Sequence, residues 1–375
     1  MNKNFSVYLD ALRFLSALTV MAAHMTFPEF TGGMVAYQGT WAGVGVTVFF
    51  VLSGYVIRFV SVEKEHTIHE FALSRMARIY SVAIPALLLT MVLDGVGALL
   101  GSARPLPMYQ YTQLWKYMPV FLSFLTDVGP IREATLSNGV FWSLSYEVWY
   151  YVLFAVVIYL TGWKRAILAI ALLAALGPRI LIYLPMWLSG VFLYEIHQWV
   201  SMSRFWARLL FVVSLCAFFA IRLTGVDDIA DAWMNRMLGG YPEKYLRNSQ
   251  YFAGRYMFAS VVFLNLFAAK YAGFEYLSRP RVRSAIVYCA SFTFTLYLAH
   301  LPLLNFYNFI MRHDPHSPAS ISALAAMVLV STWLFGLVTE HKKGWWRALF
   351  SRFIKVPAAG ERSGLDNGKE CLNQV

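Results

Sequence analysis

LDALRFLSALTVMAAH, residues 9–24, is the most apolar part of the N-terminus and lies in a segment long enough to cross a bilayer. It nevertheless contains Asp10, Arg13 and His24. Ionisable side chains are costly against lipid, so we expect Arg13 and His24 to face the protein interior or a watery cavity. They are 11 residues apart, about three helical turns, so they share one face and lie roughly 16 Å apart along the helix. The structural alternative is a helix-end arginine that reaches the membrane surface and a hydrogen-bonded core histidine.

The composition is that of an integral membrane protein. Of the 375 residues, 59% are hydrophobic and 14% are charged, against about 25% charged in soluble proteins. The three cysteines, Cys216, Cys289 and Cys371, are too far apart for a disulfide framework or a zinc pattern. The net charge of +11 follows mostly from membrane sidedness, so it does not indicate nucleic acid as a partner.

Ten apolar runs are long enough to span a bilayer, and they predict an all-α integral membrane protein with about ten transmembrane helices. The runs lie near residues 6–27, 39–60, 79–100, 139–161, 165–182, 183–200, 205–224, 251–270, 285–309 and 320–339. A further run, 114–128, contains Lys116, Pro119 and Asp127, so we expect it to be interfacial or re-entrant.

The basic residues predict that both termini are cytoplasmic. With the N-terminus inside, 20 of the 31 Lys and Arg residues fall in cytoplasmic segments, as the positive-inside rule expects. We expect the first helix to be retained, because Asp10 and Arg13 interrupt the apolar stretch that a cleavable signal needs. The predicted organisation is a membrane domain at residues 5–340 and a basic, partly disordered cytoplasmic tail at 341–375.

Three further arginines are expected at the cytoplasmic surface. Arg58 lies at the inner end of the second apolar run, and Arg75 and Arg78 are three residues apart, which places both on one helix face. Guanidinium groups bind phosphate bidentately and stay charged, which favours a multiply phosphorylated cytosolic ligand. Topology anchors beside anionic lipid are an equal alternative.

Glu147 lies inside the run at 139–161, two turns below its outer end, where a carboxylate needs a partner. His24 is expected at a comparable depth, so we expect the two side chains to pair. The imidazole would then hold a proton taken from a hydroxyl, while the carboxylate fixes its tautomer. The alternative is a structural bond from Glu147 to Tyr or Trp on a neighbouring helix.

His300 precedes Pro302 in the outer half of the run at 285–309. Because Pro302 frees a backbone carbonyl nearby, a structural kink capped by the imidazole and a catalytic role are equally expected. The sequence contains no metal-ligand pattern, no glycine-rich phosphate loop and no nucleophilic serine elbow.

Together these motifs resemble those of acyltransferase family 3, a family of integral membrane proteins, over about residues 5–340. Arg13 and His24 resemble the family's signature of an arginine, ten residues and a histidine. Four more motifs follow in the family's order: FFVLSGY at 49–55, RMARIY at 75–80, WSLSYEVWYY at 142–151 and TFTLYLAHLP at 293–302. Ser81 stands where the family usually has proline, and Thr293 and Thr295 stand where it has serines.

The resemblance implies transfer of an acyl group, usually acetyl, from cytosolic acyl-CoA to a hydroxyl group. The implied acceptor is a cell-surface polysaccharide or its lipid-linked precursor at the bacterial inner membrane. Acyl-CoA, the glycan and the bilayer are then the partners, with no permanently bound cofactor. The departures at Ser81, Thr293 and Thr295 bear on the acceptor and on local helix geometry more than on the reaction.

Residues and resemblance together lead to one mechanism. His24, oriented by Glu147, deprotonates the acceptor hydroxyl or is itself acylated first. The phosphates of acyl-CoA are expected at four arginines, and the developing oxyanion at one of three donors. The arginines are Arg13, Arg58, Arg75 and Arg78, and the donors are Ser143, Tyr150 and His300.

Two other classes of protein also have buried Arg, Glu and His in a helix bundle. One is a proton-coupled transporter or polysaccharide permease, although the sequence has no visible inverted repeat. The other is a non-catalytic partner in a glycan assembly complex. Each predicts a different result for replacement of His24 by alanine, because only the enzyme should lose acylation.

Overall fold

The computed structural model describes residues 2–101 and 108–354, and within them the fold is all-helical, with no β-strand. The helices are α1 (Lys3–Met25), α2 (Pro28–Thr31), α3 (Gly39–Glu63), α4 (Ile68–Leu99), α5 (Met108–Thr112), α6 (Leu114–Leu122), α7 (Phe141–Tyr159), α8 (Gly162–Leu181), α9 (Leu184–Trp199), α10 (Arg204–Thr224), α11 (Val226–Met237), α12 (Phe252–Tyr271), α13 (Pro280–Ala290), α14 (Thr293–Ile310), α15 (Pro318–Val338) and α16 (Lys343–Phe350), with short turns η1 (Pro242–Leu246), η2 (Arg247–Ser249), η3 (Glu275–Ser278) and η4 (Glu340–Lys342). The predicted fold class is confirmed.

The number of spans is smaller than the ten expected. In the described part of the chain, seven helices are long and apolar enough to cross a membrane, or up to nine if each bent pair is one span. The bent pairs are α8 with α9, at 105°, and α13 with α14, at 47°. The runs at 165–182 and 183–200, which we expected to cross separately, are therefore one bent pair. The run at 114–128 is not a full span, as expected, because α6 has only nine residues.

The bend between α8 and α9 is stabilised by hydrogen bonds to its backbone. Gly177 adopts a φ of +75° directly before Pro178, which breaks the helical ladder near the end of α8. Three carbonyls at the bend accept hydrogen bonds from hydroxyls, namely Arg179 from Ser249 (2.7 Å), Ile180 from Tyr150 (2.6 Å) and Ile182 from Tyr256. The broken backbone is thus satisfied inside the protein, as a membrane environment requires.

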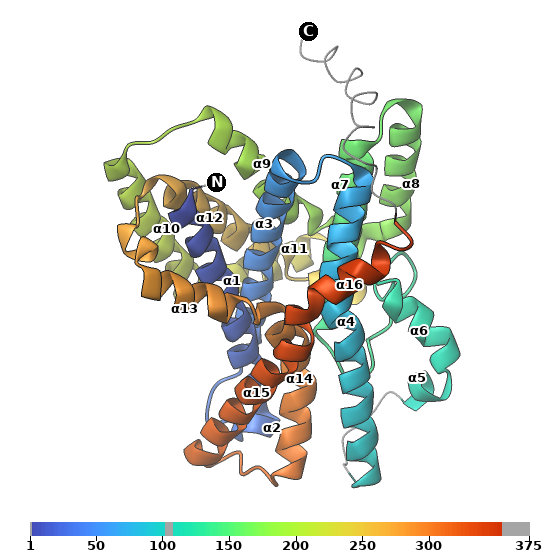
Figure 1. Cartoon of the computed structure of the whole chain (residues 1–375). Helices are drawn as coiled ribbons and strands as arrows, with labels where there is room; N and C mark the ends of the chain where they lie inside the picture. The colour runs from blue at the N-terminus through green and yellow to red at the C-terminus, as the bar shows by residue number, and fades with distance from the viewer. Residues whose placement is uncertain (1, 102–107, 355–375) are drawn as a thin grey trace.

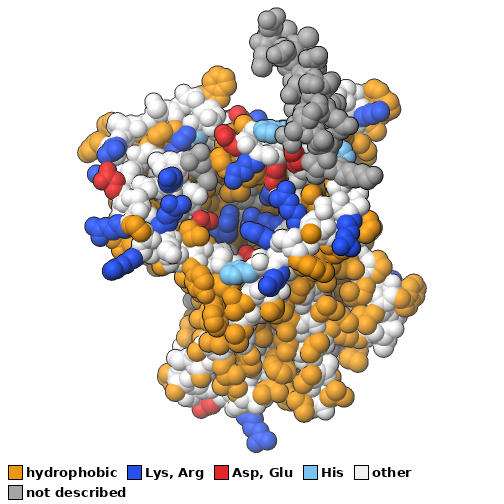
Figure 2. Space-filling model, in the orientation of Figure 1, with side chains coloured by type: hydrophobic (Ala, Val, Ile, Leu, Met, Phe, Trp, Pro, Cys, Tyr) orange, Lys and Arg blue, Asp and Glu red, His pale blue; other side chains and the backbone are white. Residues whose placement is uncertain are grey.

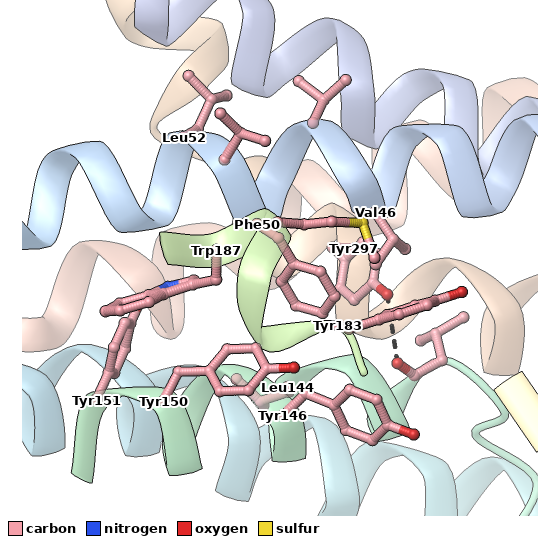
Figure 3. Packing of buried hydrophobic residues seen from close by; sticks show 14 of the residues in the cluster. Val46, Phe50, Leu52, Leu144, Tyr146, Tyr150, Tyr151, Tyr183, Trp187 and Tyr297 are labelled. Carbon is pink, nitrogen blue, oxygen red and sulfur yellow. Dashed lines mark hydrogen bonds between the residues drawn. The ribbon is translucent and has the colours of Figure 1, made fainter. Parts of the chain in front are cut away.

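Two glycines allow α9 to pack closely against α3. A Cβ atom at Gly54 would collide with the backbone carbonyl of Trp187, and one at Gly190 would collide with that of Val51. Close backbone approach at small residues is a usual packing device of membrane helices. Figure 3 shows the aromatic core beside this contact, where Phe50, Tyr146, Tyr150, Tyr183 and Trp187 pack against one another.

The outer surface divides into an apolar part and a charged part. Apolar side chains cover the lower part of the face in Figure 2, while Lys and Arg side chains gather above them. Large apolar residues are exposed along the helices at the edge of the bundle, including Ile170 on α8 and Phe205 and Val212 on α10. Such a surface fits contact with lipid tails.

The long helix α4 extends beyond a membrane's hydrocarbon layer. Its 32 residues measure about 48 Å, against about 30 Å for the layer. Thr67 and Glu70 form a capping box that fixes its start. α16 crosses α4 (Figure 1), and the rings of Phe350 and Tyr80 lie 5.7 Å apart. The expected tail at 341–375 thus begins with a helix, and its residues 355–375 lie outside the described part.

Candidate active site

A cavity of about 90 Å³, partly open to solvent, lies between α1, α3, α4, α7 and α14. Figure 2 shows a hollow in which basic side chains gather. The cavity walls are apolar apart from Arg13, Ser53, Arg75, Arg78, Ser143, Glu147, Tyr151, Thr293, Tyr297 and Glu340. These side chains come from five helices and from η4, so the site forms only when the bundle is folded.

Three of the four predicted phosphate-binding arginines meet at this cavity. Arg13 lies 3.5 Å from Asp10, and Arg75 donates to Glu65 at 2.8 Å. Arg75 also has an Nε atom without a hydrogen-bond partner in the described part of the chain. Arg78 is exposed and forms no ion pair with any residue of 2–101 or 108–354. The cavity therefore offers the unpaired guanidinium of Arg78 and the unpartnered Nε–H of Arg75 to an anion.

Arg58, the fourth predicted arginine, lies elsewhere. It does not line the cavity, and its Nε donates to the carboxylate of Glu195 on α9. The reason is its position on the face of α3 that packs against α9. The expectation that Arg58 joins the other three is therefore wrong.

Glu147 is held by one hydroxyl from α3 and one from its own helix, α7. The hydroxyls of Ser53 (2.6 Å) and Tyr151 both donate to its Oε1 atom. Trp187 donates from its ring nitrogen to Ser53 Oγ at 3.2 Å. Tyr151 also lies beneath Arg75, whose guanidinium carbon is 6.0 Å from the ring centre. These bonds connect the carboxylate to the arginine side of the cavity.

His24 pairs with His300 and not with Glu147. His24 Nδ1 lies 3.0 Å from His300 Nε2, and His300 Nδ1 lies 3.0 Å from the carbonyl oxygen of Leu296. Since a carbonyl only accepts, His300 Nδ1 carries a hydrogen and its Nε2 has the lone pair, so His24 donates from Nδ1. The Nε2 atom of neutral His24 then carries the lone pair and can act as a base.

The expected His24–Glu147 pair is therefore wrong. The positions of His24 and Glu147 along their apolar runs predicted that both side chains lie in the outer half of the membrane. In the structure, Glu147 lies in the cavity with the arginines, and His24 contacts α14. The expected imidazole cap of the proline kink is also wrong. Pro302 leaves the carbonyl of Leu298 free, and the side-chain amide of Asn138 donates to it at 2.8 Å.

Neither His24 nor His300 is among the residues that line the cavity, but two hydroxyls of its wall lie near the pair. Ser143 Oγ and Tyr297 Oη are 2.5 Å apart, and both residues line the cavity. The ring of Tyr297 lies 6.2 Å from the ring of His300, which is fully buried. Tyr150, by contrast, is fully buried outside the lining and donates to the α8–α9 bend, so its predicted oxyanion contact is wrong.

Several cavity residues were not predicted from the sequence. Tyr297, Thr293, Ser53 and Tyr151 all lie within the quoted motifs, but no charge singles them out. Glu340 is not in any motif, and its carboxylate accepts from the backbone N–H and hydroxyl of a threonine in the first turn of α14. A helical spacing of three or four residues from Glu147 and His300 was the available signal for Tyr151 and Tyr297.

The comparisons agree with this geometry. The model of a family described as an acyltransferase domain, acyltransferase family 3, matches residues 6–340, which include every residue that lines the cavity. No curated protein and no solved structure matches the chain. In the described part of the chain, no three His, Cys, Asp or Glu side chains are arranged to hold a metal ion. The chain is a multi-pass membrane protein that belongs to acyltransferase family 3, and it is an acyltransferase.

Proposed function

We propose that the protein moves an acyl group, acetyl in the simplest case, from cytosolic acyl-CoA to a hydroxyl of a cell-surface polysaccharide or its lipid-linked precursor. The bacterial inner membrane is the proposed location, with both termini in the cytoplasm. The observation that carries the proposal is one cavity whose lining holds Arg13, Arg75 and Arg78 together with the Ser143–Tyr297 pair, with the buried His300 and its half-buried partner His24 close to Tyr297.

The phosphates of the donor bind to Arg13, Arg75 and Arg78. Arg78 supports this assignment most directly, since it is exposed and has no ion-pair partner in the described residues. Arg58 is left out of the donor site because Glu195 engages it. The thioester of the donor then reaches the far end of the cavity, beside Tyr297.

His24 acts as the base through its Nε2 atom. In direct transfer, Nε2 takes the proton of the acceptor hydroxyl, the oxygen attacks the thioester carbon, and the carbon–sulfur bond breaks. The departing thiolate of CoA then takes the proton from His24. In the alternative route Nε2 attacks the thioester carbon, the carbon–sulfur bond breaks and CoA leaves as its thiolate. The acceptor oxygen then attacks the acyl carbon on His24, the carbon–nitrogen bond breaks, and the thiolate takes the hydroxyl proton.

Neighbouring groups stabilise the charges that develop. His300 accepts from His24 Nδ1, so it fixes the tautomer of His24 and steadies the imidazolium that forms. The hydroxyls of Ser143 and Tyr297 lie nearest the proposed position of the thioester. One of them donates to the other, which leaves one O–H of the pair to bind the oxyanion. Glu147 has no contact with His24 and takes no part in this step.

Labelled acetyl-CoA tests the proposal. We expect membranes that contain the wild-type chain to transfer label to the glycan and lipid-linked sugar fraction. His24→Ala should reduce this transfer by about 100-fold or more, because general-base catalysis contributes about that much. His66→Ala, which removes an exposed histidine outside the cavity, is the matched control and should keep wild-type transfer. Equal label from His24→Ala and the wild type would refute the role of His24.

A further inference from the structure

Two polar atoms in the cavity wall have no partner. The hydroxyl of Thr293 is buried, with the residue only 2% exposed, and it makes no hydrogen bond within the described residues. Glu147 uses only one of its oxygens, because Ser53 and Tyr151 both donate to Oε1 and no described residue donates to Oε2. An unpartnered hydroxyl buried in a cavity wall is costly, so Thr293 points to a ligand in the cavity, and the half-buried Glu147 presents its second oxygen in the same lining.

Each of the two residues lies about one helical turn from the Ser143–Tyr297 pair, in the lining of the same cavity. Ser143 on α7 is bonded to Tyr297 on α14, and these two helices contribute Glu147 and Thr293 four residues away from that bond. Four residues make about one helical turn, roughly 6 Å. Tyr151, one more turn along α7, lies against Arg75. Glu147 is therefore midway between the arginines and the Ser143–Tyr297 pair.

A carboxylate oxygen and a hydroxyl are the complements of an amide group. The carboxylate accepts from an amide N–H, and the hydroxyl donates to an amide C=O. In acyl-CoA the pantetheine arm joins the phosphates to the thioester and contains two amides. The amide nearest the thioester is separated from its sulfur by two carbons, which is close to one helical turn.

We propose that Glu147 Oε2 and Thr293 Oγ1 bind an amide of the pantetheine arm and thereby select a pantetheine thioester as the acyl donor. This inference rests on the proposed function, because it assumes that the phosphates lie at the arginines and the thioester lies beside Tyr297. Acyl donors without this arm, such as acetyl phosphate, lack the group that the two atoms recognise.

Binding to the purified full-length chain in lipid nanodiscs tests the inference by calorimetry. The two ligands are CoA and adenosine 3′,5′-bisphosphate, which has phosphates and the nucleoside but no pantetheine. Thr293→Val removes the hydroxyl and keeps the shape. We expect it to weaken CoA binding about fivefold, the effect of one neutral hydrogen bond, and to leave bisphosphate binding unchanged.

Thr332→Val is the matched control. Thr332 on α15 has a buried hydroxyl without a partner in the described residues, but it does not line the cavity. Both valine variants should unfold at the wild-type temperature or above it, because each loses a buried unpaired hydroxyl. Only Thr293→Val should lose affinity for CoA.

Glu147→Gln gives a second, independent result. We expect CoA affinity to fall about 10-fold, while bisphosphate affinity stays equal or rises because a negative charge near the arginines is removed. Equal weakening of both ligands in Thr293→Val and Glu147→Gln, or no weakening of CoA, would overturn the amide assignment. A wild-type chain that binds neither ligand would instead overturn the proposed donor itself.

Discussion

Substitutions of His300 can show whether this residue positions His24 for catalysis or only fills space in the core. His300→Leu keeps the volume filled but removes the acceptor of His24 Nδ1, so the tautomer of His24 is no longer fixed. We expect kcat to fall about 10- to 100-fold, with little change in KM for the acyl donor. His300→Gln has an amide oxygen near the place of Nε2, and it should recover part of the lost rate.

Steady-state kinetics with labelled acetyl-CoA measure both variants. If His300 only fills space, leucine should be tolerated at least as well as glutamine, because the site is fully buried. A kcat for His300→Leu equal to that of the wild type would contradict the positioning role.

The sequence predicts which individual residues belong to the site better than it predicts which of them contact each other. Charge and spacing correctly brought Arg13, Arg75 and Arg78 to one cavity, because cations inside a membrane protein must converge on a polar space. Depth along a helix did not give the direction of each side chain, so His24 and Glu147 were paired wrongly. Contacts between helices that are far apart in the sequence depend on how the helices pack, and a local sequence pattern does not show that packing.

At the element scale, the contact between α3 and α9 decides whether the bent pair can form. A methyl group at Gly190 collides with backbone atoms of α3, which cannot move aside as a flexible side chain can. We expect Gly190→Ala to destabilise the fold by about 2 kcal/mol or more. Gly95→Ala, on α4 where a Cβ meets nothing within 4 Å, should be neutral or slightly stabilising. Thermal unfolding in detergent compares the two, and equal unfolding temperatures would contradict the packing argument.

The elements themselves were largely predictable, because apolar runs of the right length have few alternatives in a membrane. The bend between α8 and α9 was not. Gly177 and Pro178 signal a break, but the hydroxyls of Tyr150, Ser249 and Tyr256 that stabilise it come from other helices. The sequence therefore located the two apolar runs and missed their joint role.

For the whole molecule, the membrane topology depends on whether the two ends of the α8–α9 pair lie on the same side of the membrane or on opposite sides. Lys164 and Arg165 lie at the start of α8, and Arg204 and Arg208 lie at the start of α10, just beyond α9. The positive-inside rule favours both ends on the cytoplasmic side. The 105° bend allows this, because a chain that turns back within the membrane emerges on the side from which it entered.

Single cysteines at Lys164 and Ser201, both exposed, test this arrangement in a chain whose native cysteines are replaced by serine. We expect a membrane-impermeant maleimide to label both positions in inside-out vesicles and neither in intact cells. A cysteine at Arg312, in the turn between α14 and α15, should show the opposite pattern and serves as the control. Labelling of Lys164→Cys and Ser201→Cys from opposite sides would make the pair a full span. The two ends of the chain would then lie on opposite sides of the membrane, because the remaining spans keep their order.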